Sequence, residues 1–128
     1  MAYKDLVAIV VDDYATMRRI IKNILKNLHF KEIIEAENGL EALRLLESNK
    51  VDLIVSGWDM PTMTGLELLK RVRADERLKR LPFLMVSAKA QKENIIEAIQ
   101  AKVSNYVLKP FSPAAFAEKL AKIIPQGQ

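Results

Sequence analysis

The chain has 128 residues, of which half are hydrophobic and 28% are charged, and its formal net charge is +4. A chain of this length buries about two-thirds of its unfolded surface, so we expect a single domain over residues 1–128. Cysteine is absent, which excludes disulfides and thiolate metal sites. The N-terminal stretch MAYKDLVAIVVDD has neither the ~20 apolar residues of a membrane span nor a cleavage pattern. We therefore expect a cytoplasmic protein with no membrane partner.

Basic residues are concentrated in one stretch of the chain. They are Lys70, Arg71, Arg73, Arg77, Lys79 and Arg80. The acids Asp75 and Glu76 interrupt this run. A mixed surface of this kind is usually solvated, so we expect no nucleic-acid partner.

The first half of the chain alternates apolar strands with amphipathic helices. Residues 6–11 form a continuous aliphatic run, typical of a parallel strand buried on both faces, and Asp12-Asp13 ends it. Apolar residues at helical spacing then predict a helix over 14–28 with one buried stripe, formed by Met17, Ile20, Ile21, Ile24, Leu25 and Leu28. A short strand over 33–36 follows. Asn38 next caps a helix that carries Leu40, Leu43 and Leu46.

The second half repeats this alternation. Residues 51–55 predict a third strand, and the capping box from Thr64 to Glu67 opens a helix that reaches about residue 74. Residues 81–86 predict a fourth strand, with Pro82 near its start, where a missing donor is tolerated. A helix over about 91–101 and a strand over 105–108 come next. Ser112-Pro113 begins the last helix, whose stripe is Phe116, Leu120 and Ile124.

Five strands alternating with five helices predict an α/β fold, with an open parallel sheet covered on both faces. Ligands of such sheets bind at the carboxyl ends of the strands. This rule selects a small set of candidate site residues, which are Asp12, Asp13, Gly57, Asp59, Ser87 and Lys109-Pro110.

Five segments carry a family resemblance: DDYATMRRII, AENGLEAL, WDMPTMTGLELL, LMVSAKAQKENI and NYVLKPF. Together they resemble the receiver domain of two-component response regulators, most of all the single-domain chemotaxis regulators of the CheY type. The resemblance implies a flavodoxin-like (βα)5 sandwich with strand order 2-1-3-4-5. It also implies a signalling role rather than an enzyme. A histidine kinase of the chemotaxis type would donate a phosphoryl group, and the monomer would then dock on a flagellar motor switch protein or another partner.

The same resemblance assigns roles to three residues around the phosphoryl group. Ser87 matches the hydroxyl that hydrogen-bonds the phosphoryl oxygens, and Lys109 matches the lysine that pairs with the carboxylate or the phosphoryl group. Tyr106 matches the aromatic residue whose ring position tracks activation. The peptide bond between Lys109 and Pro110 is often cis in this family.

One position departs from the family pattern and bears on the metal site. Asp12 and Asp13 match the acidic pair that binds Mg²⁺, an ion that takes hard oxygen ligands. The phosphoacceptor aspartate should stand two residues before Asp59, where this chain has Gly57. Glycine offers no side chain to phosphorylate, and the lost ligand and charge should weaken Mg²⁺ binding. Lys109 also loses its nearest expected partner, and Asp12 and Asp13 are then its only obvious ones.

Asp59 is not expected to replace the missing acceptor. Two residues of extended chain displace its Cα by roughly 6.6 Å, and the family uses its backbone carbonyl, not its carboxylate, as a metal ligand. Gly57 is then either an engineered replacement that blocks phosphorylation or a recent natural loss.

Two further departures concern the fourth helix and its surroundings. Lys102 stands where the family commonly has glycine, so we expect this helix to end without the usual left-handed cap. Lys89 stands where chemotaxis members commonly have glutamate. It lies near the face of the fourth helix, fifth strand and fifth helix that the family uses for docking.

Single residues also have simpler roles. Asp12-Asp13 alone could form a helix N-cap, and Trp58 is expected to pack beside the pocket. His29, the one histidine, falls at a helix end away from the strand-end site, which argues against Ser-His chemistry.

Three function classes remain. The first is a signalling switch with its usual phosphorylation site blocked. The second is a receiver that binds its partner without phosphorylation. The third, a flavodoxin-like nucleotide binder, is disfavoured because Asp12 and Asp13 place negative charge where a phosphate would bind.

Overall fold

The computed structural model describes residues 3–124. Strands and helices alternate along the chain: β1 Val7–Val11, α1 Ala15–Asn27, β2 Glu32–Ala36, α2 Gly39–Ser48, β3 Leu53–Gly57, α3 Gly65–Ala74, β4 Phe83–Ser87, α4 Lys92–Gln100, β5 Asn105–Leu108 and α5 Pro113–Ala121. Within these residues, no helix combines the length and apolar character needed to cross a membrane.

The five strands form one parallel sheet in the order β2-β1-β3-β4-β5, as expected. The register sets Val11 beside Ser56, Gly57 beside Val86, and Ser87 beside Leu108. Because all strands run the same way, their carboxyl ends meet at one edge of the sheet. The loops that follow β1, β3, β4 and β5 therefore face one another there.

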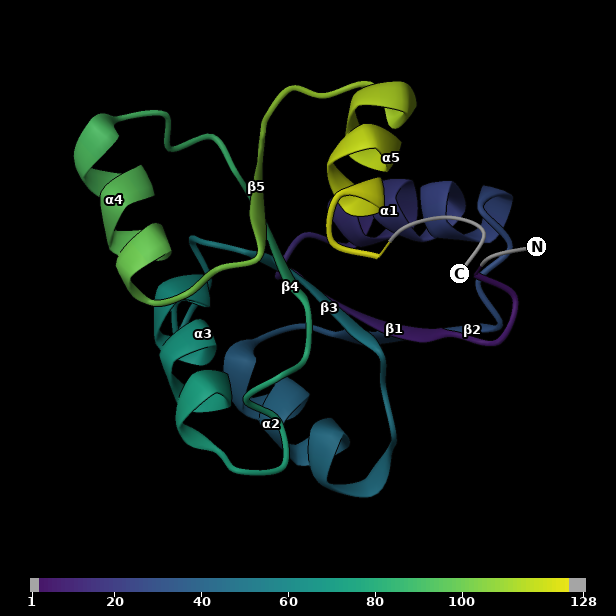
Figure 1. The fold of residues 1–128 in the computed structure, drawn as a ribbon, viewed down its shortest axis with the longest axis horizontal. Coiled ribbons are helices and arrows are strands. Elements are labelled where there is room, and N and C mark those ends of the chain that lie inside the picture. Colours follow the sequence, from purple (N-terminus) through teal and green to yellow (C-terminus); the bar gives the residue numbers. More distant parts are fainter. Residues whose placement is uncertain (1–2, 125–128) are drawn as a thin grey trace.

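Helices cover both faces of the sheet, as Figure 1 shows, with α1 and α5 on one side and α2 and α3 on the other. Alternate residues of each central strand point to opposite faces. Thus Ala8 and Val10 pack with Phe116 of α5, whereas Ile9 and Val11 belong to the core that contains Leu69 of α3. Strands β3 and β4 are buried along their whole length, which explains the apolar runs 53–55 and 83–86.

Two strands, β3 and β4, differ from the prediction by more than one residue. β3 begins at Leu53, and the strand extends to Gly57. Val51 is buried but precedes the ladder, where the Asp52 side chain accepts a hydrogen bond from Val7 N–H at 2.9 Å. β4 begins at Phe83, after the proline that has no N–H to donate. The shift in β3 places Gly57 inside the strand, as its last paired residue.

The expectation that α4 lacks a left-handed cap is wrong. Lys102 has φ 69°, its N–H bonds to Ile99 O, and Val103 N–H bonds to Ala98 O. This pair of hydrogen bonds is a Schellman motif, so the lysine adopts the conformation that glycine usually supplies. α1 ends in the same way at His29, with φ 73°, at the far end of the helix from the carboxyl edge.

Two residues of the predicted apolar stripes are not buried. Ile20 of α1 is 43% exposed, and Leu40 of α2 is 53% exposed. α2 buries Ala42 together with Leu46, which the predicted stripe contains. Ile124 lies beyond the end of α5 but still packs against the α1–α5 core.

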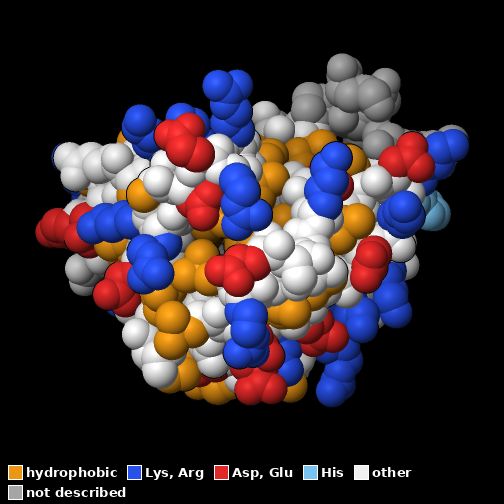
Figure 2. Space-filling view, turned by 90° about the horizontal axis from the view of Figure 1, so that it is seen from below, with side chains coloured by type: hydrophobic (Ala, Val, Ile, Leu, Met, Phe, Trp, Pro, Cys, Tyr) orange, Lys and Arg blue, Asp and Glu red, His pale blue; other side chains and the backbone are white. Residues whose placement is uncertain are grey.

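The surface seen from below carries mixed charge. Figure 2 shows Lys and Arg side chains interspersed with Asp and Glu over this face, with apolar atoms between them. No broad field of a single sign is visible on it.

Candidate functional site

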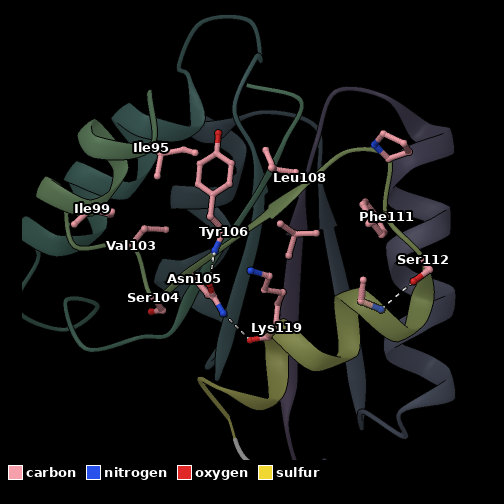
Figure 3. Close-up of a pocket in the computed structure, with 13 residues that line it drawn as sticks. Ile95, Ile99, Val103, Ser104, Asn105, Tyr106, Leu108, Phe111, Ser112 and Lys119 are labelled. Atoms are coloured by element: carbon pink, nitrogen blue, oxygen red, sulfur yellow. Dashed lines mark hydrogen bonds between the residues drawn. The ribbon is translucent and has the colours of Figure 1, made fainter. Parts of the chain in front are cut away.

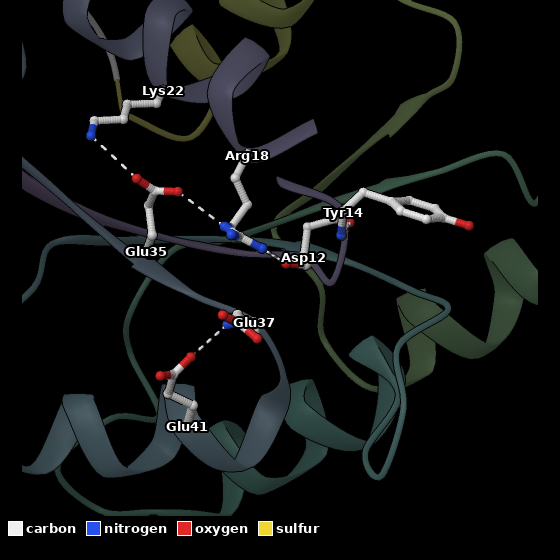
Figure 4. A network of polar contacts seen from close by, with 7 residues as sticks. All are labelled: Asp12, Tyr14, Arg18, Lys22, Glu35, Glu37 and Glu41. Carbon is white, nitrogen blue, oxygen red and sulfur yellow. Dashed lines mark hydrogen bonds and ion pairs between the residues drawn. The ribbon is translucent and has the colours of Figure 1, made fainter. Parts of the chain in front are cut away.

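Asp12 is the buried acid of the carboxyl edge, with 3% of its surface exposed. Its Oδ1 accepts a hydrogen bond from Tyr14 N–H at 2.9 Å, and its backbone oxygen accepts one from Arg18 Nη1 at 2.7 Å. Arg18 in turn contacts Glu35 Oε1 of β2 through Nε at 3.0 Å (Figure 4). These contacts hold Asp12 from both sides, whereas the neighbouring Asp13 is exposed.

The side chain of Asp12 lies close to the position that a Cβ atom of residue 57 would take. A Cβ on Gly57 would stand 2.7 Å from Asp12 Oδ2 and 3.4 Å from its Cγ. Gly57 is itself buried at the end of β3. The Asp12 carboxylate therefore occupies part of the space that a side chain at position 57 would need.

Lys109 follows β5 and faces the same carboxylate. Its Nζ is 3.9 Å from Asp12 Oδ2, and its N–H donates to Ser87 O at 2.9 Å. The Lys109-Pro110 peptide bond is cis, in line with the resemblance. The sequence predicted that Asp12 and Asp13 would be the remaining partners of this lysine, and Asp12 takes that role.

The pKa of Asp12 is raised above its ordinary value of 3.8, chiefly because burial disfavours the charged carboxylate. The Tyr14 N–H and the positive charge of Lys109 act in the opposite direction, and the charge of Asp13 adds to the rise. At this edge of the sheet, ionisation of the Asp12 carboxyl group therefore destabilises the folded protein.

The loop between β4 and α4 is held by the backbone of Lys89. Its N–H donates to Ser87 Oγ at 3.0 Å, and its carbonyl accepts from the Tyr106 hydroxyl at 2.9 Å. Tyr106 also packs against Trp58, with ring centroids 6.3 Å apart, and its partial burial raises its pKa. Ser87 and Tyr106 therefore contact the same residue from two strands.

Asp59 points away from the buried acid. Its side chain is 78% exposed, and its Oδ1 lies 3.6 Å from Lys89 Nζ, which is 6.0 Å from the centre of the Trp58 ring. In the sequence, Lys89 is only a departure from the family pattern near the docking face, and its ion pair with Asp59 is not predicted. The opposite charges of positions 59 and 89 were the available signal.

The donor groups fit a Mg²⁺ site poorly in this arrangement. Mg²⁺ takes hard oxygen ligands in near-octahedral geometry. Asp12 and Asp13 supply two carboxylates, but both oxygens of Asp12 already face Tyr14 N–H or Lys109. Over residues 3–124, no three Asp, Glu, His or Cys side chains are grouped to hold a metal ion.

Gly65 is a site residue that the sequence did not reveal. Its N–H donates to Trp58 O at 2.8 Å at the start of α3, and a Cβ there would stand 1.9 Å from Gly57 O. Only glycine allows the helix to approach the end of β3 so closely. The predicted capping box is present at the same helix start, with Thr64 and Glu67 exchanging hydrogen bonds.

A hollow of about 550 Å³ lies along α4, β5 and the start of α5. Figure 3 shows Ile95 and Ile99 on one side, Tyr106 and Leu108 in the middle, and Phe111 on the other side. Ile99 is 62% exposed and Leu108 is 42% exposed. The strand-end site and this partly apolar hollow share Tyr106.

The sheet order and the polar residues at its carboxyl edge define a flavodoxin-like α/β protein with an acid, a hydroxyl and a lysine at the ends of β1, β4 and β5. Comparison with known families is consistent with this class. The chain belongs to the response regulator receiver domain family, whose model matches residues 8–121.

Relatives in the family include chemotaxis proteins. The chain is 51% identical over 120 residues to the chemotaxis protein CheY-3 of Vibrio cholerae, covering 94% of this chain and 92% of the relative. It is 54% identical over 115 residues to the chemotaxis protein CheY of Pseudomonas aeruginosa, covering 90% and 93%.

Solved structures share the fold. A putative response regulator from Chloroflexus aurantiacus superposes with a TM-score of 0.89 at 28% identity, covering 96% of this chain and 100% of the other. The receiver domain of the sensor histidine kinase PA1611 from Pseudomonas aeruginosa, at 24% identity, has a TM-score of 0.83 and covers 94% and 98%. That structure holds a magnesium ion in its active-site cleft.

Proposed function

We propose that this chain is a chemotaxis response regulator of the CheY type in which Gly57 stands at the phosphoacceptor position, so that phosphorylation there is blocked. One observation carries the proposal: the Asp12 carboxylate occupies the space of a side chain at position 57 and pairs with Lys109. The buried carboxylate next to the lysine is thus supplied by β1 instead of β3. Its two oxygens face Tyr14 N–H and Lys109, and it is only 3% exposed, which disfavours its own phosphorylation.

From the same geometry we expect Mg²⁺ to bind only weakly. Asp12 and Asp13, with the backbone carbonyl of Asp59, are the groups that would hold the ion. When bound, Mg²⁺ supplies positive charge that offsets the phosphoryl oxygens. Binding requires Asp12 to exchange its Lys109 contact for the metal, and no third carboxylate offsets that loss.

Docking is the output that we propose. The hollow along α4, β5 and α5 exposes Ile99 and Leu108 beside the cationic Lys119, so it suits a partner segment with apolar and acidic side chains. A flagellar motor switch protein, or another docking partner, and a histidine kinase of the chemotaxis type are the proposed partners, met by a monomer in the cytoplasm. The protein acts by binding rather than as an enzyme.

A second candidate function is constitutive docking without phosphorylation. The contacts of Lys89 favour it, because Ser87 and Tyr106 both bond to this residue through protein groups alone. In a phosphorylation-dependent switch, the ligand stabilises one of two conformations. Here the contacts of Lys89, including its ion pair with Asp59, would stabilise one conformation permanently.

Nuclear magnetic resonance of the amides tests both candidates. Spectra are compared with and without Mg²⁺ and a small phosphodonor, for this chain and for Gly57→Asp. We expect amides near Tyr106 and Leu108 to shift in the variant only. A shift in this chain would contradict the blocked site. Constitutive docking is supported if the untreated chain already has the shifts of the treated variant, and it is excluded if the untreated chain matches the untreated variant.

A further inference from the structure

A second hollow, of about 460 Å³, lies at the opposite end of the sheet from the strand-end site. It is formed by the last turns of α3 and α4 and by the loop that enters β4. Eight residues line it: Lys70, Arg73, Ala74, Lys79, Arg80, Gln100, Ala101 and Lys102. Five of the eight are basic, and none is acidic. The proposed switch uses none of them.

The walls of this basic hollow are fixed by Arg73. Its Nε donates to Lys102 O at 2.9 Å, and its Nη1 donates to Lys79 O at 3.1 Å and Leu81 O at 2.7 Å. One guanidinium therefore ties the end of α4 to the loop before β4. The charge of Arg73 is used in building the hollow, and the other basic side chains remain at its rim.

Most of the rim charge is not neutralised by the protein. Lys79 pairs with Glu76 at 3.0 Å, but Glu76 is 87% exposed, so this pair is weak. Within residues 3–124, Lys70, Arg80 and Lys102 form no ion pair, and all three are exposed. Three cations from different elements thus surround one concave surface without a partner.

The backbone of Lys102 adds a second, independent observation. At φ 69° a lysine is strained, and glycine would form the same cap without that cost. A cation at the end of α4 does favour the helix dipole. That benefit accounts for Lys102 alone, since Lys70 lies in the middle of α3 and Arg80 in a loop.

We infer that the basic hollow binds an acidic peptide segment of a protein partner. Its cations stand on long, flexible side chains over a floor that includes Ala74 and Ala101, which suits several carboxylates spaced along a peptide. The negative charge near the hollow, from the C-terminal ends of α3 and α4 and from Asp75 and Glu76, opposes every anion. The preference for a peptide therefore rests on the spread of the cations around the rim, and phosphate and nucleic acid are outcomes of the test.

The test uses an acetylated, amidated hexamer of glutamate as the probe, with amide resonances of the whole chain followed during titration. We expect saturable shifts at Lys70, Arg80 and Lys102. Lys70→Ala and Lys102→Gly should each weaken binding by about 2- to 5-fold, as expected for the loss of one exposed ionic contact. The matched control Lys92→Ala removes one exposed α4 cation outside the hollow and should leave binding unchanged.

Lys102→Gly also separates charge from folding. The variant should melt at a higher temperature than the parent chain while binding the hexamer more weakly, so weaker binding cannot be ascribed to unfolding. Raising the salt concentration should weaken binding in the parent chain.

Four results would overturn the inference: no saturable shift at the hollow, equal weakening by Lys92→Ala, the same shifts from inorganic phosphate at equal concentration, or tighter binding of an oligothymidylate of equal charge. The third would indicate a small-anion site, and the fourth a nucleic-acid surface. None of them bears on Gly57, because the hollow and the strand-end site lie at opposite ends of the sheet.

Discussion

Replacing Gly57 by aspartate should displace Asp12 and strengthen Mg²⁺ binding. The new Cβ would stand 2.7 Å from Asp12 Oδ2, so the Asp12 side chain must rotate away. A second carboxylate at about 4 Å repels Asp12 by roughly 4 kcal/mol at an effective dielectric of 20, and Lys109 attracts it by a similar amount. These terms nearly cancel, and we expect a net loss of about 1–2 kcal/mol without metal, mainly from burying a further charge.

Added Mg²⁺ should reverse that loss. At a concentration of 100 times its Kd, a ligand that binds only the folded state stabilises it by about 2.7 kcal/mol. For a chain of this length, that corresponds to a rise of roughly 8–15 °C in Tm. The unsubstituted chain should gain less than about 2 °C at the same concentration. Thermal unfolding with and without Mg²⁺ measures both.

Gly57→Asn is the matched control for Gly57→Asp. It has nearly the same volume but no charge, so it should displace Asp12 without recovering the response to Mg²⁺. Two results would refute the reasoning: an equal gain in Tm for the asparagine variant, or a gain in the unsubstituted chain as large as that of the aspartate variant. Either would mean that the residues present already form a competent metal site.

Three further predictions concern the surroundings of the site. Gly65→Ala should lower the unfolding free energy by more than about 2 kcal/mol in urea, because its Cβ meets the backbone at 1.9 Å, whereas Gly39→Ala meets the flexible side chain of a methionine and should cost less. Lys89→Glu should repel its acidic partner at the loop, change the fluorescence of Trp58, and speed amide exchange there; an unchanged spectrum and exchange rate would count against the ion pair. Because the pKa of Asp12 is raised on folding, its ionisation destabilises the protein as pH rises from below 3.8 through the folded pKa. The free energy of unfolding of Asp12→Asn, measured relative to that of the parent chain, should therefore rise over this pH range. A difference that stays constant with pH would contradict the shift.

The fold was largely predictable because the sheet is buried on both faces. Apolar runs indicate β1, β3 and β4, and side-chain caps mark the starts of α2, α3 and α5. The end of β3 was less visible. Backbone pairing continues through Ser56 and Gly57, two small residues that have no strand pattern of their own.

The helix cap at Lys102 shows a limit of residue preferences. Glycine is favoured in a left-handed cap, but two backbone hydrogen bonds outweigh the strain of a lysine there. Sequence preference alone therefore predicted the wrong ending for α4.

The members of the site were predictable, but their directions were not. Topology alone brings Asp12, Ser87 and Lys109 to one edge. The position of the Asp12 carboxylate beside Gly57 depends on its rotation toward Lys109. A side chain at position 57 would oppose that rotation. The outward direction of Asp59 likewise depends on Lys89, a residue 30 positions away in the sequence.

The most direct test of the central proposal is the intact mass of the protein after incubation with Mg²⁺ and a small phosphodonor, measured beside Gly57→Asp under the same conditions. We predict a phosphoryl adduct on the variant and none on the unsubstituted chain. An adduct on the unsubstituted chain, located by peptide mapping at Asp12, Asp59 or another residue, would contradict the proposal that Gly57 blocks phosphorylation.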